Sequence, residues 1–100
     1  MQISTIDDIV SYLKGRKTFL REEFGVTRLG IFGSFSLGDQ TMQSDIDLLV
    51  EIEDSRKNIH TFLQLRRLLE KELSKRVDLG IEATLKPVVR ENIKERIIYV

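Results

Sequence analysis

The chain lacks cysteine and has only one histidine, His60, and one proline, Pro87. Without thiols it cannot form a disulfide framework or a thiolate zinc site, and one histidine cannot build a histidine cluster. Mg²⁺ or Mn²⁺ bound by oxygen ligands is therefore the metal chemistry that remains open. No apolar run approaches the roughly 20 residues that cross a bilayer, and the first residues show no signal-peptide pattern. We therefore expect a cytoplasmic protein that does not bind membranes.

An excess of charge of one sign is also absent, because 16 acidic residues balance 16 Lys and Arg residues. This balance argues against direct nucleic-acid binding, which usually needs a strong positive field. The charges are unevenly distributed, however: residues 1–55 hold ten acids and five bases, and residues 56–100 hold six acids and eleven bases. The basic half could meet a polyphosphate or an acidic partner, but a solvated helix face is the simpler interpretation.

The length of 100 residues and the 41% hydrophobic content suit one small domain, residues 1–100, with one core. Apolar spacing and capping residues predict the order helix, strand, strand, helix, strand, helix. The expected ranges are 5–24, 26–32, 45–53, 59–74, 77–81 and about 84–96. The first two strands can pair antiparallel, and the second and third, joined through a helix, should be parallel. The expected fold class is therefore α/β (α+β), a small mixed β-sheet with helices packed on it.

The most informative pattern is Gly33-Ser34 followed, after ten residues, by Asp45-Ile46-Asp47. A Gly-Ser turn at the end of a strand can present backbone N–H groups and a hydroxyl to phosphate. Two carboxylates two residues apart on a strand point to the same side, about 7 Å from each other. Two Mg²⁺ ions about 4 Å apart fit between such carboxylates and a polyphosphate. The pattern therefore predicts a magnesium–nucleotide site.

A third carboxylate, Asp78, lies on the later strand. If the two acidic strands are parallel neighbours, their spacing of about 4.8 Å brings Asp78 beside Asp45 and Asp47. Glu51 shares the face of Asp45 and Asp47 and is a candidate supporting acid. Taken alone, the Asp-Ile-Asp tripeptide could simply begin a strand with one wet face. The upstream Gly-Ser, the apolar strand that follows and the third acid together favour a site.

The Gly-Ser, ten-residue, Asp-x-Asp pattern that begins at Gly33 resembles the signature of the DNA polymerase beta-like nucleotidyltransferase superfamily. Within it, the chain is most similar to the minimal nucleotidyltransferase (MNT) domain proteins. These are small prokaryotic proteins often encoded beside a HEPN-domain toxin, for which they act as antitoxins. The resemblance covers nearly the whole chain, including residues 76–79, where Asp78 matches the third metal-binding carboxylate, and the ending over 85–100.

The resemblance implies a nucleotidyltransferase (polymerase beta-like) fold and a Mg²⁺-dependent enzyme that transfers AMP, or another NMP, from ATP or another NTP to a hydroxyl. The implied acceptor is a tyrosine of a cognate HEPN toxin, which must bring this group because no acceptor-binding domain is expected here. Asp45, Asp47 and Asp78 would be catalytic and would bind two Mg²⁺ ions. Gly33 and Ser34 would bind the nucleotide phosphates. Homo-oligomers are also compatible with the pattern.

The chain departs from the family at the Gly-Ser loop, which usually carries Ala-Arg before its second glycine. Here the loop reads Ser36-Leu37-Gly38, so a cation near the phosphates is missing. This departure keeps open an alternative, a non-catalytic antitoxin or binding module that occludes its partner. Transfer to a small molecule such as an aminoglycoside is disfavoured, because no second domain is expected to enclose it. The sequence leaves the base preference and the acceptor open.

The last four residues, 97–100, form an apolar, β-prone end. We expect this end to help form a partner or self-association surface, either as an edge strand or in an apolar groove. Packing into the core is an equal alternative, since scattered apolar residues are normal on a surface.

Overall fold

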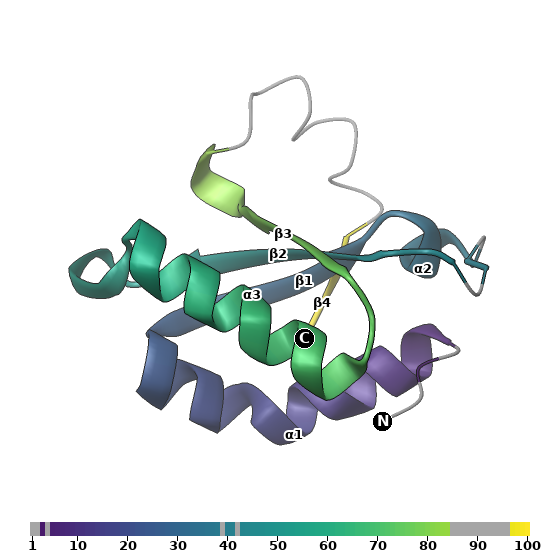
Figure 1. Cartoon of the computed structure of the whole chain (residues 1–100), viewed down its shortest axis with the longest axis horizontal. Helices are drawn as coiled ribbons and strands as arrows, with labels where there is room; N and C mark the ends of the chain where they lie inside the picture. Colours follow the sequence, from purple (N-terminus) through teal and green to yellow (C-terminus); the bar gives the residue numbers. More distant parts are fainter. Residues whose placement is uncertain (1–2, 4, 39, 42, 85–96) are drawn as a thin grey trace.

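The structure is a computed structural model that describes residues 3, 5–38, 40–41, 43–84 and 97–100. Figure 1 shows the elements in chain order. They are α1 (Ile6–Phe24), β1 (Val26–Phe32), α2 (Ser34–Leu37), β2 (Ile46–Ile52), η1 (Asp54–Arg56), α3 (Ile59–Leu73), β3 (Val77–Ile81), η2 (Glu82–Thr84) and β4 (Ile98–Tyr99). The helix expected over 84–96 falls outside the described residues, apart from Thr84, which ends η2.

The four strands form one mixed sheet in the order β3-β2-β1-β4. Strand β2 pairs antiparallel with β1 and parallel with β3, and β4 pairs antiparallel with β1. The mixed sheet and both expected strand pairings are thus confirmed. Helices α1 and α3 lie together on one face of this sheet, and neither of them covers the other face (Figure 1).

The hydrophobic core lies between that helical layer and the sheet. Every second residue of β2 points into it, and the apolar residues of α1 and α3 meet them at helical spacing. The members with no exposed surface are Ile9, Leu13, Leu20, Ile31, Ile46, Leu48, Leu65, Leu69 and Leu73. None of the described helices is both long and apolar enough to cross a bilayer. Because the even-numbered residues of β2 fill the core, its odd-numbered residues must face the other way.

Both ends of α1 and the start of α3 are fixed by residues close by in the sequence. Thr5 caps α1 through a reciprocal pair of hydrogen bonds with Asp8, and Gly25 ends the helix with φ of 73°. Asn58 caps α3 by accepting a hydrogen bond from the Thr61 N–H. Gly25 ends α1, and β1 begins at the next residue. The last residue of β1, Phe32, is directly followed by Gly33.

The segment after Gly33 differs from expectation. The expected strands over 26–32 and 45–53 left the residues between them without an element, but residues Ser34–Leu37 form the short helix α2. Phe35 anchors this helix, because its side chain is 1% exposed and belongs to the core. The mostly polar composition of this segment gave no sign of the buried aromatic side chain.

The C-terminal residues add a fourth strand to the sheet. In β4, Tyr99 pairs with Gly30 and Ile98 pairs with Ile31, and the Val100 N–H donates to the Leu29 carbonyl. Val100 also packs against the core, so this end takes part in folding. The side chains of β4 nevertheless keep 37% and 42% of their surface exposed. A role of this end in binding a partner therefore stays a prediction.

Candidate active site

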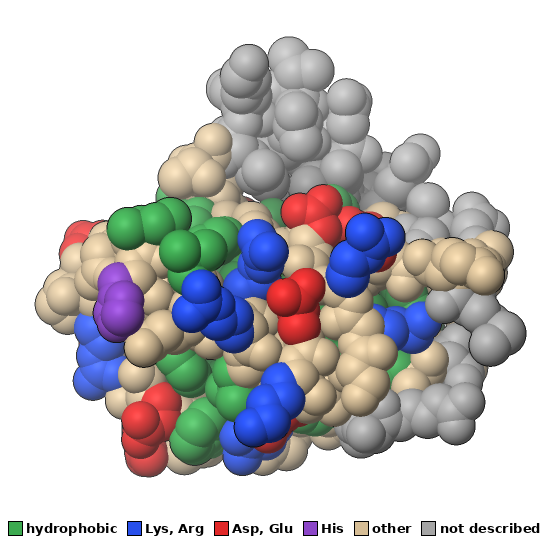
Figure 2. Space-filling view, in the orientation of Figure 1, with side chains coloured by type: hydrophobic (Ala, Val, Ile, Leu, Met, Phe, Trp, Pro, Cys, Tyr) green, Lys and Arg blue, Asp and Glu red, His purple; other side chains and the backbone are tan. Residues whose placement is uncertain are grey.

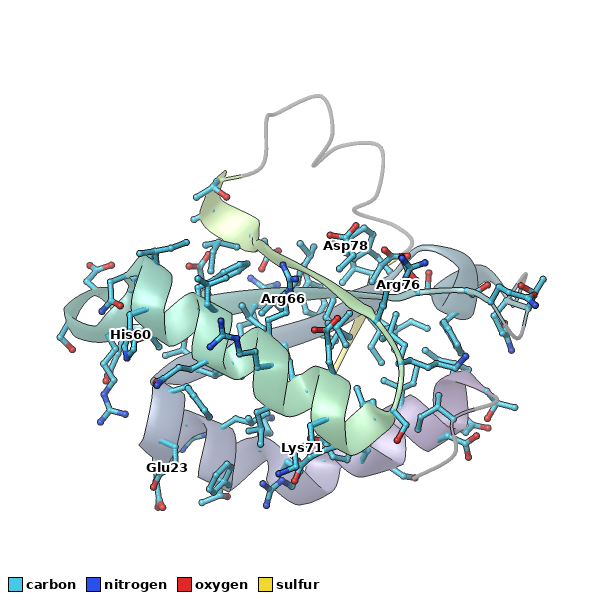
Figure 3. The ribbon with its side chains drawn as sticks, in the orientation of Figure 1. Glu23, His60, Arg66, Lys71, Arg76 and Asp78 are labelled. Carbon is cyan, nitrogen blue, oxygen red and sulfur yellow. The ribbon has the colours of Figure 1, made fainter. Side chains whose placement is uncertain are left out.

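The acidic residues lie on the sheet face that α1 and α3 leave free. In the parallel pairing of β2 with β3, Asp47 lies directly beside Asp78, and in the antiparallel pairing with β1 it lies beside Phe32. Figure 3 shows Asp78 on the side of β3 away from α1. The predicted convergence of Asp47 and Asp78 is therefore present, and it follows from strand register alone.

Asp47 carries the electrostatic strain of this arrangement. Its pKa is raised from the ordinary 3.8 to about 6, mainly because burial disfavours the charged form. The neighbouring charges of Asp78 and Asp45 raise the pKa further, as does a hydrogen bond with Asp78. Two carboxylates held this close repel each other when both are ionised, so a bound cation would stabilise the pair.

Gly33 lies so close to the Asp47 carboxylate that no residue with a side chain could take its place without a clash. A Cβ added at Gly33 would stand 2.0 Å from Asp47 Oδ2, and the backbone φ of 75° also disfavours a side chain. The Ser36 hydroxyl donates to the Gly33 carbonyl over 2.9 Å and helps to fix this turn. Ser34 follows as the first residue of α2, but its side chain lies outside what the structure describes. Phosphate binding by Gly33 and Ser34 stays a prediction.

Asp45 lies at the same end of β2 but is turned toward a cation. Its Oδ1 is 3.2 Å from Arg76 Nε, and the two side chains are 43% and 82% exposed. The Ile46 N–H donates to the Arg76 carbonyl over 3.0 Å, which holds the two residues side by side. The sequence interpretation gave Arg76 no role at the site, and the structure places it directly before β3. The signal that could have found it is its position two residues before Asp78, on the same strand face.

Glu51, the candidate supporting acid, is engaged elsewhere. Its carboxylate forms a 2.9 Å ion pair with Lys57 and accepts a hydrogen bond from the Ala83 N–H over 2.8 Å. These contacts join the end of β2 to η1 and η2, so Glu51 supports the chain around the sheet and not the acids at the other end of β2.

The acids suit magnesium in their chemistry, although they are not yet arranged around one point. Among the described side chains, no group of three acidic or histidine residues is placed to hold a metal ion. Asp45 is instead engaged in an ion pair with Arg76. Carboxylate oxygens are the ligands that Mg²⁺ prefers, and the Asp47–Asp78 repulsion is what a divalent cation relieves. The residues therefore fit Mg²⁺ once Asp45 leaves Arg76.

A groove of about 440 Å³ lies elsewhere, between the start of α3 and the end of β3. Its described lining is mainly apolar, with no acidic residue among these members: Ile52, Lys57, Asn58, Ile59, Phe62, Leu79, Gly80, Ile81 and Thr84. Ile59 on its rim is 70% exposed, and Figure 2 shows apolar side chains near His60 in this region. The groove is thus separate from the carboxylates, and the chemistry expected of the chain lies outside it.

Comparison with known proteins agrees with this geometry. The family model for the nucleotidyltransferase domain matches residues 13–100. The protein adenylyltransferase MntA of Thermococcus cleftensis is 36% identical over 100 residues, which cover 100% of both chains. A solved structure assigned as a minimal nucleotidyltransferase has a TM-score of 0.80 at 28% identity and covers 95% of both chains. A toxin–antitoxin crystal structure with AMP-PNP has a TM-score of 0.70 at 23% identity, covering 86% of this chain and 70% of that one, and shows likeness of fold.

Proposed function

This chain belongs to the family of nucleotidyltransferase domains, and from that premise we propose that it is an antitoxin that adenylylates its partner. It transfers AMP, or another NMP, from an NTP to a hydroxyl group, in a reaction that depends on Mg²⁺. The observation that carries the proposal is the Asp47–Asp78 pair on the free face of the sheet, in contact with the Gly33 turn.

The chain's own side chains bind and orient the reactants. Asp45, Asp47 and Asp78 would hold Mg²⁺ beside the bound nucleotide. When bound, the ions neutralise the phosphate charge and lower the pKa of the acceptor hydroxyl. The acceptor oxygen forms a bond to the α-phosphorus, the bond to the pyrophosphate oxygen breaks, and pyrophosphate leaves. In this proposal Asp78 also accepts the hydroxyl proton.

The acceptor is a tyrosine of a cognate HEPN toxin. A protein acceptor is supported by the similar protein of Thermococcus cleftensis, which is a protein adenylyltransferase. A toxin partner is supported by the fold shared with a protein crystallised in a toxin–antitoxin complex with AMP-PNP. Adding AMP to the toxin places a bulky anionic group on it, which is a chemical route to neutralisation.

A non-catalytic role is the second candidate, in which the chain occludes its partner without modifying it. Two observations favour it. Leu37 stands where the family usually has an arginine, and Asp45 is engaged by Arg76. Both reduce the attraction of the site for magnesium and phosphate in the ligand-free protein.

Labelling separates the two candidates. The protein encoded beside this chain is co-purified with it and incubated with Mg²⁺ and ATP labelled at the α-phosphate. We expect label on a tyrosine of the partner, and we expect the Asp47→Asn variant to lose at least about 100-fold in transfer rate. An unlabelled partner that is still inhibited by the wild-type chain would establish occlusion and reject catalysis.

A further inference from the structure

The site lacks the loop arginine of the family, yet an NTP brings several negative charges to a face that already carries three carboxylates. Magnesium offsets part of this charge, and phosphate sites commonly add an arginine. The loop has Leu37 at the usual arginine position. Within the described part of the chain, the ion pair that reaches these acids comes from Arg76.

The sheet places Arg76 on the same face as the acids. Residues 46 and 77 are partners in the parallel pairing of β2 with β3, and so are Asp47 and Asp78. Asp45 directly precedes residue 46, and Arg76 directly precedes residue 77. The Asp45 carboxylate and the Arg76 guanidinium contact each other at 3.2 Å. On the sheet face that α1 and α3 leave free, Arg76 and Asp45 therefore lie side by side. Two residues further along the strands, at a distance of about 7 Å, Asp78 and Asp47 lie side by side in the same way. Figure 3 shows Arg76 and Asp78 next to each other on this side of β3.

The contact between Arg76 and Asp45 is easily exchanged. The Arg76 side chain is 82% exposed, and an ion pair this accessible contributes little to folding. A guanidinium that leaves a carboxylate can bind a phosphate with the same paired N–H donors. Asp45, in turn, is free to bind metal only when Arg76 has moved away.

We propose that Arg76 exchanges partners when the nucleotide binds, moving from Asp45 to the phosphate chain of the NTP. It thereby supplies the cation that the Gly33–Gly38 loop lacks, and it releases Asp45 to the metal. This inference rests on the proposed function and adds a phosphate-binding residue to it. The triphosphate is the part of the substrate that Arg76 recognises, and the base plays no part in its contact.

The exchange predicts opposite effects of one substitution on two ligands. In Arg76→Ala, Mg²⁺ alone should bind up to about fivefold more tightly, because Asp45 has lost its competitor. MgATP should bind about tenfold more weakly or worse, because a charge-assisted contact with phosphate is lost. Calorimetric titration of the full chain with MgCl₂ and with MgATP measures both. Arg76→Lys should recover part of the MgATP affinity, since lysine keeps the charge but not the paired geometry.

Arg67→Ala is the matched control, since Arg67 is an exposed cation on α3 and should leave both affinities unchanged. Loss of both affinities in Arg76→Ala would make Arg76 a purely structural residue and overturn the exchange. Unchanged MgATP binding in that variant would also overturn it, while leaving the proposed function intact if the wild type binds. A wild-type chain that binds no MgATP would reject the proposed function and the inference together.

Discussion

At the scale of single residues, Asp47 links folding to the chemistry proposed for the site. Its backbone belongs to a buried strand. Its carboxylate lies against Gly33 and is repelled by the charges of Asp78 and Asp45. A carboxyl whose pKa rises on folding destabilises the folded state when it ionises. In the ligand-free protein, ionised Asp47 thus lowers the free energy of unfolding, and a bound cation would remove this destabilisation.

We therefore expect Asp47→Asn to stabilise the metal-free protein in a pH-dependent way. Folded Asp47 has a pKa of about 6, so the native state holds its proton more tightly than the unfolded state does. The contribution of the Asp47 carboxyl to the wild-type free energy of unfolding is fully present below about pH 4. It is lost as the pH rises through about 6. The variant should gain roughly 1 kcal/mol at about pH 8, after allowance for solvent screening, and almost nothing near pH 4.

Urea denaturation in the presence of a chelator measures this difference in the free energy of unfolding. Asp54→Asn is the control, because Asp54 is fully exposed in η1 and its loss should change stability by less than about 0.5 kcal/mol at either pH. A stability gain in Asp47→Asn that does not depend on pH would show that charge repulsion is not its cause.

At the scale of elements, the short strand β4 depends on the residue beneath it. A Cβ added at Gly30 would stand 2.6 Å from Ile97 Cγ2 and 3.3 Å from the Tyr99 ring. The Tyr99 hydroxyl donates to Glu82 over 2.6 Å, and the Arg28 guanidinium lies 4.1 Å from the centre of its ring. The absence of a side chain at Gly30 leaves room for Ile97 and Tyr99 where β4 pairs with β1, and the Tyr99 hydroxyl ties this end of the chain to η2.

Two glycine substitutions should consequently have opposite effects. Gly30→Ala forces Ile97 and Tyr99 to shift, and we expect it to destabilise the protein by about 1–3 kcal/mol. Gly15→Ala lies within α1 with nothing within 4 Å, so it should stabilise by up to about 1 kcal/mol. Thermal and urea denaturation of both variants provide the comparison. Equal stability of Gly30→Ala and the wild type would mean that β4 is not held on β1 in this way.

At the scale of the whole molecule, one face of the sheet packs against the helices and stabilises the fold, and the other face carries the acids proposed for the chemistry. Alternate residues of β2 and β3 face the helices and form the core, and the residues between them face away and carry the acids. Tyr12, Arg16 and Glu72 join α1 to α3 by hydrogen bonds on the far side of that core. Substitutions on the two faces should therefore change different properties.

A pair of alanine variants tests this separation. Leu65→Ala removes a fully buried side chain from α3 and should cost about 2–5 kcal/mol of unfolding free energy, with transfer activity retained in the folded fraction. Asp78→Ala should leave the unfolding free energy within about 0.5 kcal/mol of wild type or raise it, and should abolish AMP transfer. Urea denaturation and the labelling assay measure both. Wild-type transfer by Asp78→Ala would remove this residue from the site.

Local signals explain how much of the fold could be predicted. The caps at Thr5 and Gly25, the spacing of apolar residues and the strand lengths all act over a few neighbouring residues, so the sequence shows them directly. The pairing of β1, β2 and β3 also followed from the connections between them. The short helix α2 was missed because it depends on burial of Phe35, which no local pattern reveals.

By itself, the sequence predicted which residues would carry the chemistry: a glycine turn and three carboxylates at fixed spacing. Only the tertiary structure decided how they stand, because strand register and side-chain partners join residues far apart in the chain. It set Asp78 beside Asp47, raised the pKa of Asp47, and turned Asp45 toward Arg76. It also placed the last residues on β1, since a strand finds its partner by packing and hydrogen bonding across the whole fold.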